Sequence, residues 1–356
     1  MVGALHRRLL AGLMGLALVS ALLPAPAAGA VSFTFTISLG YQAVIGSGPP
    51  SALHTITLFA PSGEIRAVAL VTSDASGYWY AGLDEPVFGG DKVRASALGA
   101  SRTVTVPGLW MRANRVTDVI SGKWMANTVL KVLVTHRPAL DYSATYHDRT
   151  TTAGPTGTFS IDFTGTVDLK GADTYGAVYM SGPDAFWVSQ WIPYMVVRRA
   201  NTSVEGIVNP AQVVTLTLKD SLGNVRGSAT AQGDYKGFFY GDFATGVGEP
   251  VLPRKTDRVV GSFGSDANVT VPDIRLSGVA ATDVVTGACM AGVPFELFAR
   301  KADYGDYVYR YGTTDSGGNL TRDLTADVNL AKGDVLRLTC RYTTGDRVVY
   351  VAYVTT

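Results

Sequence analysis

Residues 77–80 read Gly-Tyr-Trp-Tyr and residues 237–240 read Gly-Phe-Phe-Tyr, so a glycine followed by three aromatic residues recurs after 160 positions. Between them Gly157 precedes Phe159, and beyond them Gly318 precedes Leu320. A glycine that ends a polar turn and opens an apolar run about every 80 residues is the signature of a tandem-repeat protein. The sequence therefore predicts four modules with one fold.

Longer blocks of the first and third modules also match at a constant offset. Residues 63–66 (Gly-Glu-Ile-Arg) correspond to residues 223–226 (Gly-Asn-Val-Arg) at an offset of 160, whereas residues 104–107 (Val-Thr-Val-Pro) recur at 269–272, an offset of 165. The five additional residues fall between these blocks. Because insertions concentrate in surface loops, this difference predicts a loop insertion around residues 246–255.

Two further markers recur once in each module. One is a series of glycines spaced by 81 to 84 residues: Gly40, Gly122, Gly206 and Gly287. The other is an aspartate that opens an apolar run: Asp91, Asp257 and Asp334, from which the second module departs with Ala172-Asp173. The landmarks predict modules at residues 31–116, 117–201, 202–281 and 282–356, of which the second is the most divergent.

Apolar and polar residues alternate within a module. Residues 31–39 place Val, Phe, Phe, Ile and Leu between Ser and Thr, and residues 213–219 follow the same period of two, which is typical of strands with one buried face. Forty glycines and only 17% charged residues favour short strands and tight turns over helices. The sequence therefore predicts an all-β chain of four tandem, small antiparallel β-sandwich (Ig-like) modules.

The junctions between modules contain no flexible linker. Runs such as Thr117-Asp118-Val119 lead directly from one predicted module into the next. This continuity predicts an extended array that behaves as a stiff rod. With modules about 30 to 35 Å long, the rod would measure on the order of 130 Å.

The first thirty residues have the pattern of a secretory signal peptide. Arg7 and Arg8 precede an apolar run over residues 9–23, and the small residues Ala-Gly-Ala follow at 28–30. The run is about fifteen residues long, which is shorter than the roughly twenty that a membrane-crossing helix needs. We expect cleavage after Ala30, no membrane insertion afterwards, and a secreted or cell-surface location.

Several blocks of the third module carry a family resemblance. Residues 204–208, the run 213–218, Gly223 and residues 237–239 together resemble the carboxypeptidase-regulatory-like and related immunoglobulin-like repeats of bacterial exported proteins. The other modules show the resemblance more weakly. In that family the repeats serve as spacers, stalks and adhesive modules, so the resemblance implies a structural role and brings no catalytic residues with it.

The chain has two cysteines, Cys289 and Cys340, and both lie in the last predicted module. In an exported chain the simplest interpretation is a disulfide within that module. The alternative is a pair of small buried thiols.

The residues that would support catalysis or metal binding are sparse. After the signal peptide only His54, His136 and His147 remain, with no metal-binding spacing and no nucleophile motif. A site that joins His136 and His147 with an aspartate is the alternative that would make the chain an enzyme. The net charge of +1, with both signs mixed, gives no footprint for nucleic acid. We expect no enzyme activity, no cofactor and no metal.

Aromatic residues are the remaining candidates for a ligand-binding face. Trp187, Trp191 and Tyr194 cluster in the second module, and Tyr307, Tyr309 and Tyr311 share one face of a strand in the fourth. Exposed rings of this kind recognise carbohydrate, whereas buried ones fill sandwich cores or pair across strands. The hypothesis of binding through the second module would fail if both tryptophans were buried.

The sequence as a whole predicts a secreted or cell-surface structural protein of adhesion type that acts as a stiff rod or spacer. Its partners would be other copies of itself, the cell envelope or a glycan. The alternative is an extracellular carbohydrate-binding array that uses the aromatics of the second module. The final run, residues 348–354, predicts a core strand or an edge that accepts a strand from a neighbour.

Overall fold

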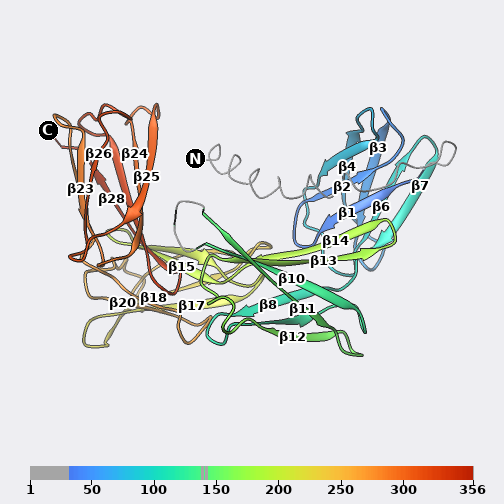
Figure 1. The fold of residues 1–356 in the computed structure, drawn as a ribbon, viewed down its shortest axis with the longest axis horizontal. Helices are drawn as coiled ribbons and strands as arrows, with labels where there is room; N and C mark the ends of the chain where they lie inside the picture. The colour runs from blue at the N-terminus through green and yellow to red at the C-terminus, as the bar shows by residue number, and fades with distance from the viewer. Residues whose placement is uncertain (1–31, 138–139, 141–142, 356) are drawn as a thin grey trace. The chain divides into compact units, whose positions relative to one another are not determined.

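A computed structural model describes residues 32–137, 140 and 143–355 of the chain. The predicted signal peptide, residues 1–30, lies outside the described residues. The described residues form 28 β-strands, so the chain is all-β as predicted (Figure 1). Among them no helix has the length and apolar character that crossing a bilayer requires.

The strands fall into four repeats of seven, and each repeat builds two sheets in one order. The first, second and fifth strands form a three-stranded sheet, and the fourth, third, sixth and seventh form a four-stranded sheet. Consecutive strands within these sheets pair antiparallel, which is the arrangement of an immunoglobulin-like sandwich. Repeated antiparallel sandwich modules are therefore confirmed.

The bounds of the strands are as follows. The first repeat contains β1 (Thr34–Ser38), β2 (Ala43–Ser47), β3 (Leu53–Phe59), β4 (Ile65–Thr72), β5 (Tyr78–Gly82), β6 (Lys92–Ala97) and β7 (Ala100–Thr105). The second contains β8 (Trp110–Asn114), β9 (Val119–Lys123), β10 (Val129–His136), β11 (Thr145–Thr152), β12 (Thr158–Asp162), β13 (Thr174–Ser181) and β14 (Asp184–Trp191). The third contains β15 (Tyr194–Arg198), β16 (Ser203–Ile207), β17 (Val213–Lys219), β18 (Val225–Gln232), β19 (Phe238–Asp242), β20 (Arg258–Gly261) and β21 (Asn268–Thr270). The fourth contains β22 (Arg275–Val279), β23 (Val284–Ala288), β24 (Pro294–Arg300), β25 (Tyr307–Thr313), β26 (Asn319–Asp323), β27 (Val335–Arg341) and β28 (Arg347–Tyr353).

The chain divides into two compact units. Unit 1 holds the first repeat up to Pro107 together with residues 179–187, and unit 2 holds residues 108–178 and 188–356. Each unit contains one parallel strand pair that the alternation pattern does not indicate. In unit 1 the start of β14 pairs with β1, and in unit 2 the start of β28 pairs with β15.

The parallel pair of unit 2 joins the third and fourth repeats into one sheet of seven strands, in the order β19-β16-β15-β28-β27-β24-β25. The buried residues of these two repeats also form one continuous core cluster that runs from Met195 to Val354. Strand β28 lies between β15 and β27, so residues 347–349 offer no free edge to a neighbouring molecule. The hypothesis that the final strand accepts a strand from a neighbouring molecule is therefore wrong for residues 347–349.

The strand pairing also bears on where the modules begin. Strands β8, β15 and β22 pair with the second strand of their own repeats, although residues 117, 202 and 282 were the predicted boundaries. We propose that the modules begin just before these three strands. These starts lie before residues 117, 202 and 282 because each of the three strands belongs to the sheet of the repeat that it opens.

One glycine series marks equivalent positions in all four repeats. Gly77, Gly157, Gly237 and Gly318 have positive φ angles between 81° and 86°, which glycine adopts without strain. The carbonyl of each accepts a hydrogen bond from the backbone N–H of the residue that follows the second strand of its repeat: Gly48, Trp124, Val208 and Cys289. The spacing of these glycines therefore reflects one turn, built four times.

The second glycine series needs one correction. Gly122, Gly206 and Gly287 lie in the second strand of their repeats, where an added Cβ would lie 2.1 to 3.0 Å from the carbonyl oxygen of the first strand. In the first repeat this position is Gly46, where the Cβ would lie 2.3 Å from the Thr34 carbonyl. Gly40 lies instead in the turn before β2. The equal spacing of Gly40 is therefore a coincidence.

Candidate functional site

The predicted aromatics of the second module lie on two strands and are partly exposed. Trp187 is half-buried on the part of β14 that belongs to unit 1, where it pairs with Ser38. Trp191 ends β14 in unit 2 with 37% of its surface exposed, and the Arg137 guanidinium lies 5.6 Å from its ring. Tyr194 is half-buried on β15, under the guanidinium of Arg347. Neither tryptophan is buried, so the condition that would exclude a binding face is not met.

The three tyrosines of the fourth repeat form a ladder along β25. Tyr307 and Tyr309 lie 5.9 Å apart and edge-on, and Tyr309 and Tyr311 lie 6.3 Å apart with planes 7° from parallel. Across the sheet, Phe298 of β24 lies 4.8 Å from Tyr309 and is covered by the Arg337 guanidinium. The ladder is most open at Tyr307, which is 61% exposed. These rings pair across strands and also present a face to solvent.

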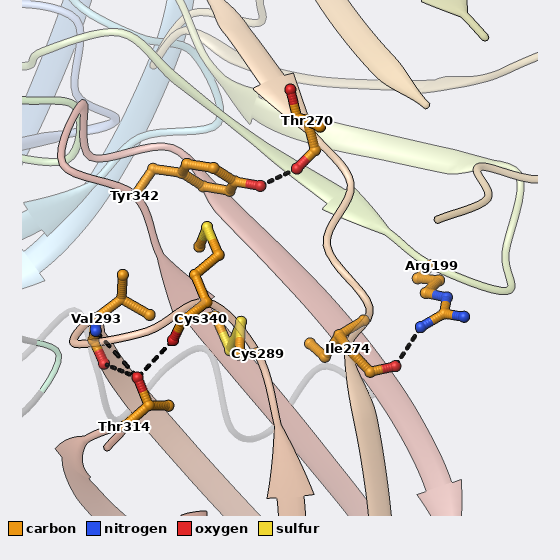
Figure 2. Close-up of a disulfide and its surroundings, with 9 residues drawn as sticks. Arg199, Thr270, Ile274, Cys289, Val293, Thr314, Cys340 and Tyr342 are labelled. Atoms are coloured by element: carbon orange, nitrogen blue, oxygen red, sulfur yellow. Dashed lines mark hydrogen bonds between the residues drawn. A yellow bond between two sulfur atoms is a disulfide. The ribbon is translucent and has the colours of Figure 1, made fainter. Parts of the chain in front are cut away.

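The predicted disulfide is present (Figure 2). Cys289, just after β23, is bonded to Cys340 of β27, so the bridge links the three-stranded sheet of the fourth repeat to the four-stranded sheet. Nearby, Thr314 donates a hydrogen bond to the Met290 carbonyl and accepts one from the Val293 N–H. The bridge closes a loop of 51 residues, which constrains the unfolded chain and stabilises the repeat.

His136, at the end of β10, contacts the buried aspartate of a turn. Its Nδ1 lies 2.8 Å from a carboxylate oxygen of Asp173, which is fully buried. His147 contacts the Thr145 hydroxyl instead, and among the described residues no hydrogen bond or ion pair joins the two histidines. Across all residues that the structure describes, no group of three or more His, Cys, Asp or Glu side chains is placed to hold a metal.

The Asp173 turn occurs in every repeat. A buried aspartate precedes the sixth strand and accepts the backbone N–H of the residue three positions earlier: Asp91, Asp173, Asp257 and Asp334. Each also binds a basic side chain, Arg66, His136, Arg226 and Lys301 respectively, and Asp173 has a second such partner in Arg341, at 3.7 Å. The preceding residue has a positive φ in all four, including Ala172. The second module thus departs in sequence here but keeps the turn.

Asp334 shows how such a turn favours the ionised acid. Burial opposes ionisation, but the N–H groups of Ala331 and Ala302, at 2.7 and 2.9 Å, and the Lys301 ammonium, at 2.9 Å, stabilise the carboxylate. Together they lower the pKa of Asp334 below its usual value. The turn is therefore an acid-sensitive element of the sandwich.

A second buried aspartate holds the parallel strand pair of unit 1. Asp184, at the start of β14, accepts the backbone N–H of Phe35 in β1 at 3.0 Å. Arg102 of β7 forms a bidentate pair with the same carboxylate and donates to the Phe33 carbonyl at 2.7 Å. Asp184 is 3% exposed, so these donors offset the cost of burying its carboxylate. The carboxylate thereby joins β14 to β1 and β7.

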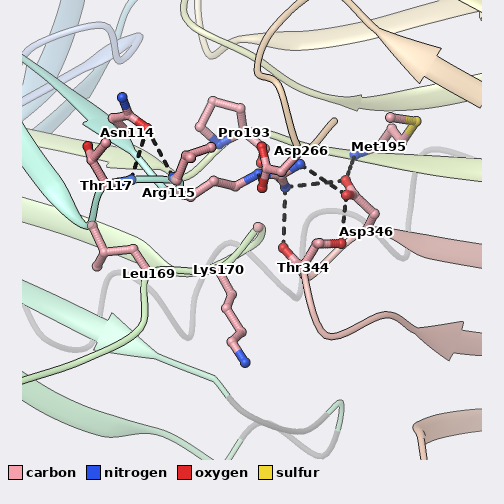
Figure 3. A network of polar contacts seen from close by, with 12 residues as sticks. Asn114, Arg115, Thr117, Leu169, Lys170, Pro193, Met195, Asp266, Thr344 and Asp346 are labelled. Atoms are coloured by element: carbon pink, nitrogen blue, oxygen red, sulfur yellow. Dashed lines mark hydrogen bonds and ion pairs between the residues drawn. The ribbon is translucent and has the colours of Figure 1, made fainter. Parts of the chain in front are cut away.

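Unit 2 repeats this device (Figure 3). Asp346, at the turn before β28, is fully buried and accepts the N–H of Met195 in β15 at 2.8 Å, as Asp184 does from Phe35. The Arg115 Nη2 lies 3.0 Å from its other oxygen, and the Thr344 hydroxyl donates at 2.9 Å. Burial raises the pKa of Asp346, and the Arg115 charge opposes this shift.

Arg115 connects three repeats of unit 2. From the end of β8 it reaches Asp346 in the fourth repeat, the Pro193 carbonyl before β15 and Asp266 in the third, whose oxygen lies 2.6 Å from its Nε. Its side chain is 6% exposed. Beside it is a cavity of about 310 Å³ lined by residues 113–116, 193 and 263–266. The arrangement fixes the mutual orientation of these repeats.

The sequence reasoning did not identify Asp184, Asp346, Arg102 or Arg115. A signal was present: Asp184 and Asp346 are separated by 162 residues, close to the offset that relates the first module to the third, and each follows a turn rich in Gly and Pro or Thr. The same offset between the second and fourth modules pairs the two acids. Their partners become evident only when the strands are paired.

Comparisons with known proteins return other tandem-repeat structures. The tetra-tandem repeat in the extending region of a large adhesion protein is 17% identical over 91% of this chain and 100% of that one, with a TM-score of 0.18. The BSP domain of a biofilm-associated protein (9% identity, 94% and 99% coverage) has a TM-score of 0.19, and the chicken CNTN1 FN1–FN3 domains (9%, 94% and 100%) have one of 0.21. Similarity at these TM-scores is too low to assign a fold, so the fold is assigned from the strand pairing alone. No protein-family model matches the chain, and no characterised protein matches it in sequence.

Proposed function

We propose that this chain is a secreted or cell-surface structural protein of adhesion type, a stiff spacer without enzyme activity. The observation that carries the proposal is that one seven-stranded sandwich is built four times and that the third and fourth repeats share a sheet and a core. Buried Asp184 and Asp346 hold the parallel pairs. A sheet that runs from one repeat into the next resists bending more than a flexible linker does.

The junctions within unit 2 support stiffness in the same way. Only residues 192–193 separate β14 from β15, and Ile192 is fully buried. Residues 271–274 separate β21 from β22, and both Val271 and Ile274 are buried. Residues of this kind pack into the core and do not act as hinges. The modules are of the carboxypeptidase-regulatory-like or a related immunoglobulin-like type, and the partners are other copies of the chain, the cell envelope or a glycan.

A second candidate function is carbohydrate binding, and the tyrosine ladder of β25 favours it. Tyr307, 61% exposed, and the near-parallel Tyr309 and Tyr311 offer a row of rings on which sugar faces stack. In the second module the exposed predicted aromatic is Trp191 of β14, at 37%. Carbohydrate binding requires the exposed aromatic rings, whereas the spacer role does not.

Complementation in the producing cell tests the two candidates together. A strain that lacks the gene is measured for surface attachment, and then receives the wild-type gene or a variant with Tyr307→Ala and Trp191→Ala. The spacer predicts full restoration by both genes, because exposed rings are not needed to hold the sheets. Failure of the variant, with wild-type amounts of folded protein at the surface, would contradict the spacer and support glycan binding.

A further inference from the structure

The outer edge of the four-stranded sheet in the first repeat is apolar and uncovered. Strand β4 pairs with β3 on one side only. Its outward residues Val68 and Leu70 are 52% and 68% exposed, and Leu53 of the adjacent β3 is 60% exposed. A long, exposed apolar edge strand is a template for pairing with another strand, and proteins usually protect such edges with charge or cover.

The same edge is covered in the third repeat. Strand β18 corresponds to β4 at the offset of 160, with Thr217↔Ser228 matching Thr57↔Val68 and a register shift at the same place in both pairs. The Ser228 N–H donates to the Ala244 carbonyl at 2.8 Å, and the Ala244 N–H returns a bond at 3.0 Å. Ala244 in turn bridges to Pro250. The covering segment overlaps the loop insertion that the sequence predicts.

The first repeat lacks this cover. Because the ladder register is the same, Val68 directs its N–H and C=O away from β3, as Ser228 does. Among the described residues no backbone group pairs with Val68 on that side. The side chains differ accordingly: the covered strand has Ser228 and Thr230 where the uncovered one has Val68 and Leu70. The edge β11 of the second repeat, in contrast, carries the charges of Asp148 and Arg149.

We infer that β4 is a self-association edge, which pairs antiparallel with β4 of a second copy of this chain. Pairing centred on Val68 sets Val68 against Val68 and Leu70 against Arg66, so that apolar side chains meet and no two like charges face each other. Arg66 already binds Asp91 at 2.6 Å within its own copy. The arrangement is self-complementary under a two-fold axis, as closed dimers are. The inference rests on the proposed function only in taking another copy as the partner.

The expected affinity is low for an isolated pair. One strand pair with three exposed apolar side chains covers less than the roughly 1,200 Å² of a standard stable interface. We therefore expect dissociation constants in the range of tens to hundreds of micromolar. Many copies on one surface would raise the effective affinity by avidity.

Sedimentation velocity of the chain from Val31, without the predicted signal peptide, from about 5 to 500 µM, tests the inference. The wild type is expected to show a sedimentation coefficient that rises with concentration. Val68→Lys places two ammonium groups opposite each other and should weaken the association at least tenfold. Ser228→Lys, at the equivalent exposed position of the covered edge, should leave it unchanged.

Two outcomes would overturn the inference. One is a wild-type chain that stays monomeric up to 500 µM, and the other is a Val68→Lys variant that associates as strongly as the wild type. Equal melting temperatures of the two variants exclude misfolding as a cause. Either outcome leaves the spacer role standing, because complementation measures that role separately.

Discussion

Each repeat contains a turn built around a buried aspartate, and the sandwich depends on that aspartate. Asp334 accepts two backbone N–H groups and the Lys301 ammonium while 2% exposed, so replacement leaves buried donors without an acceptor. The charged form is the one that these donors stabilise. Stability and protonation are therefore coupled at this position.

Asp334→Asn should lower the free energy of unfolding by about 1 to 3 kcal/mol at pH 7. Because the folded pKa of Asp334 lies below the usual 3.8, its contribution is complete above that value and is lost as pH falls through the folded pKa. Urea unfolding followed by circular dichroism at pH 7 and pH 3 should show the difference between variant and wild type shrink at the lower pH. Exposed Asp306→Asn is the control, and a difference that grows with acid would contradict the assignment.

Glycine in the second strand of each repeat is required by the closeness of the first strand. A Cβ on Gly206 would lie 2.1 Å from the Tyr194 carbonyl oxygen and 2.8 Å from the Phe239 ring. Gly206→Ala should therefore destabilise the chain by about 3 kcal/mol, as overpacking does. Gly82→Ala, whose added Cβ meets no atom within 4 Å, should change thermal stability little. Equal effects of the two substitutions would count against this explanation.

At the scale of elements, strand pattern and turn chemistry were predictable and long-range pairing was not. Val214, Leu216 and Leu218 are fully buried, as the alternation predicts. The parallel pairs β1 with β14 and β15 with β28 join strands about 150 residues apart and leave no periodic signature. The predicted boundaries place β8, β15 and β22 in the preceding modules, because the strand with which each of them pairs lies further along the chain.

The buried carboxylates of Asp184 and Asp346, here called the aspartate clamps, hold the two parallel strand pairs, and their contribution to stability can be measured. Asp184→Ala removes the acceptor for the Phe35 N–H and leaves Arg102 without its carboxylate. Hydrogen exchange in β1 should accelerate at least tenfold, which corresponds to about 1.4 kcal/mol. Mass spectrometry of peptides that cover residues 33–39 measures this effect. Unchanged exchange there would show that the clamp does not hold the pair, and Asp162→Ala, at an exposed site, is the control.

At the scale of the whole chain, the number of repeats followed from the spacing of the glycines, because every module must bury its own core and so repeats the same turns, whereas the fold class followed from the alternation of apolar and polar residues. The tyrosine ladder was also found from the sequence, since alternate residues of a strand share a face. The Arg115 network depends on contacts among three repeats and has no counterpart in a local pattern.

Small-angle X-ray scattering on the chain from Val31, extrapolated to zero concentration, tests the central claim of a stiff spacer most directly. The Val68→Lys variant, measured in parallel, separates the length of one chain from the effect of pairing. The account predicts a maximum dimension on the order of 130 Å for both. A radius of gyration of about 20 Å, the value for a single globule of this length, would contradict it.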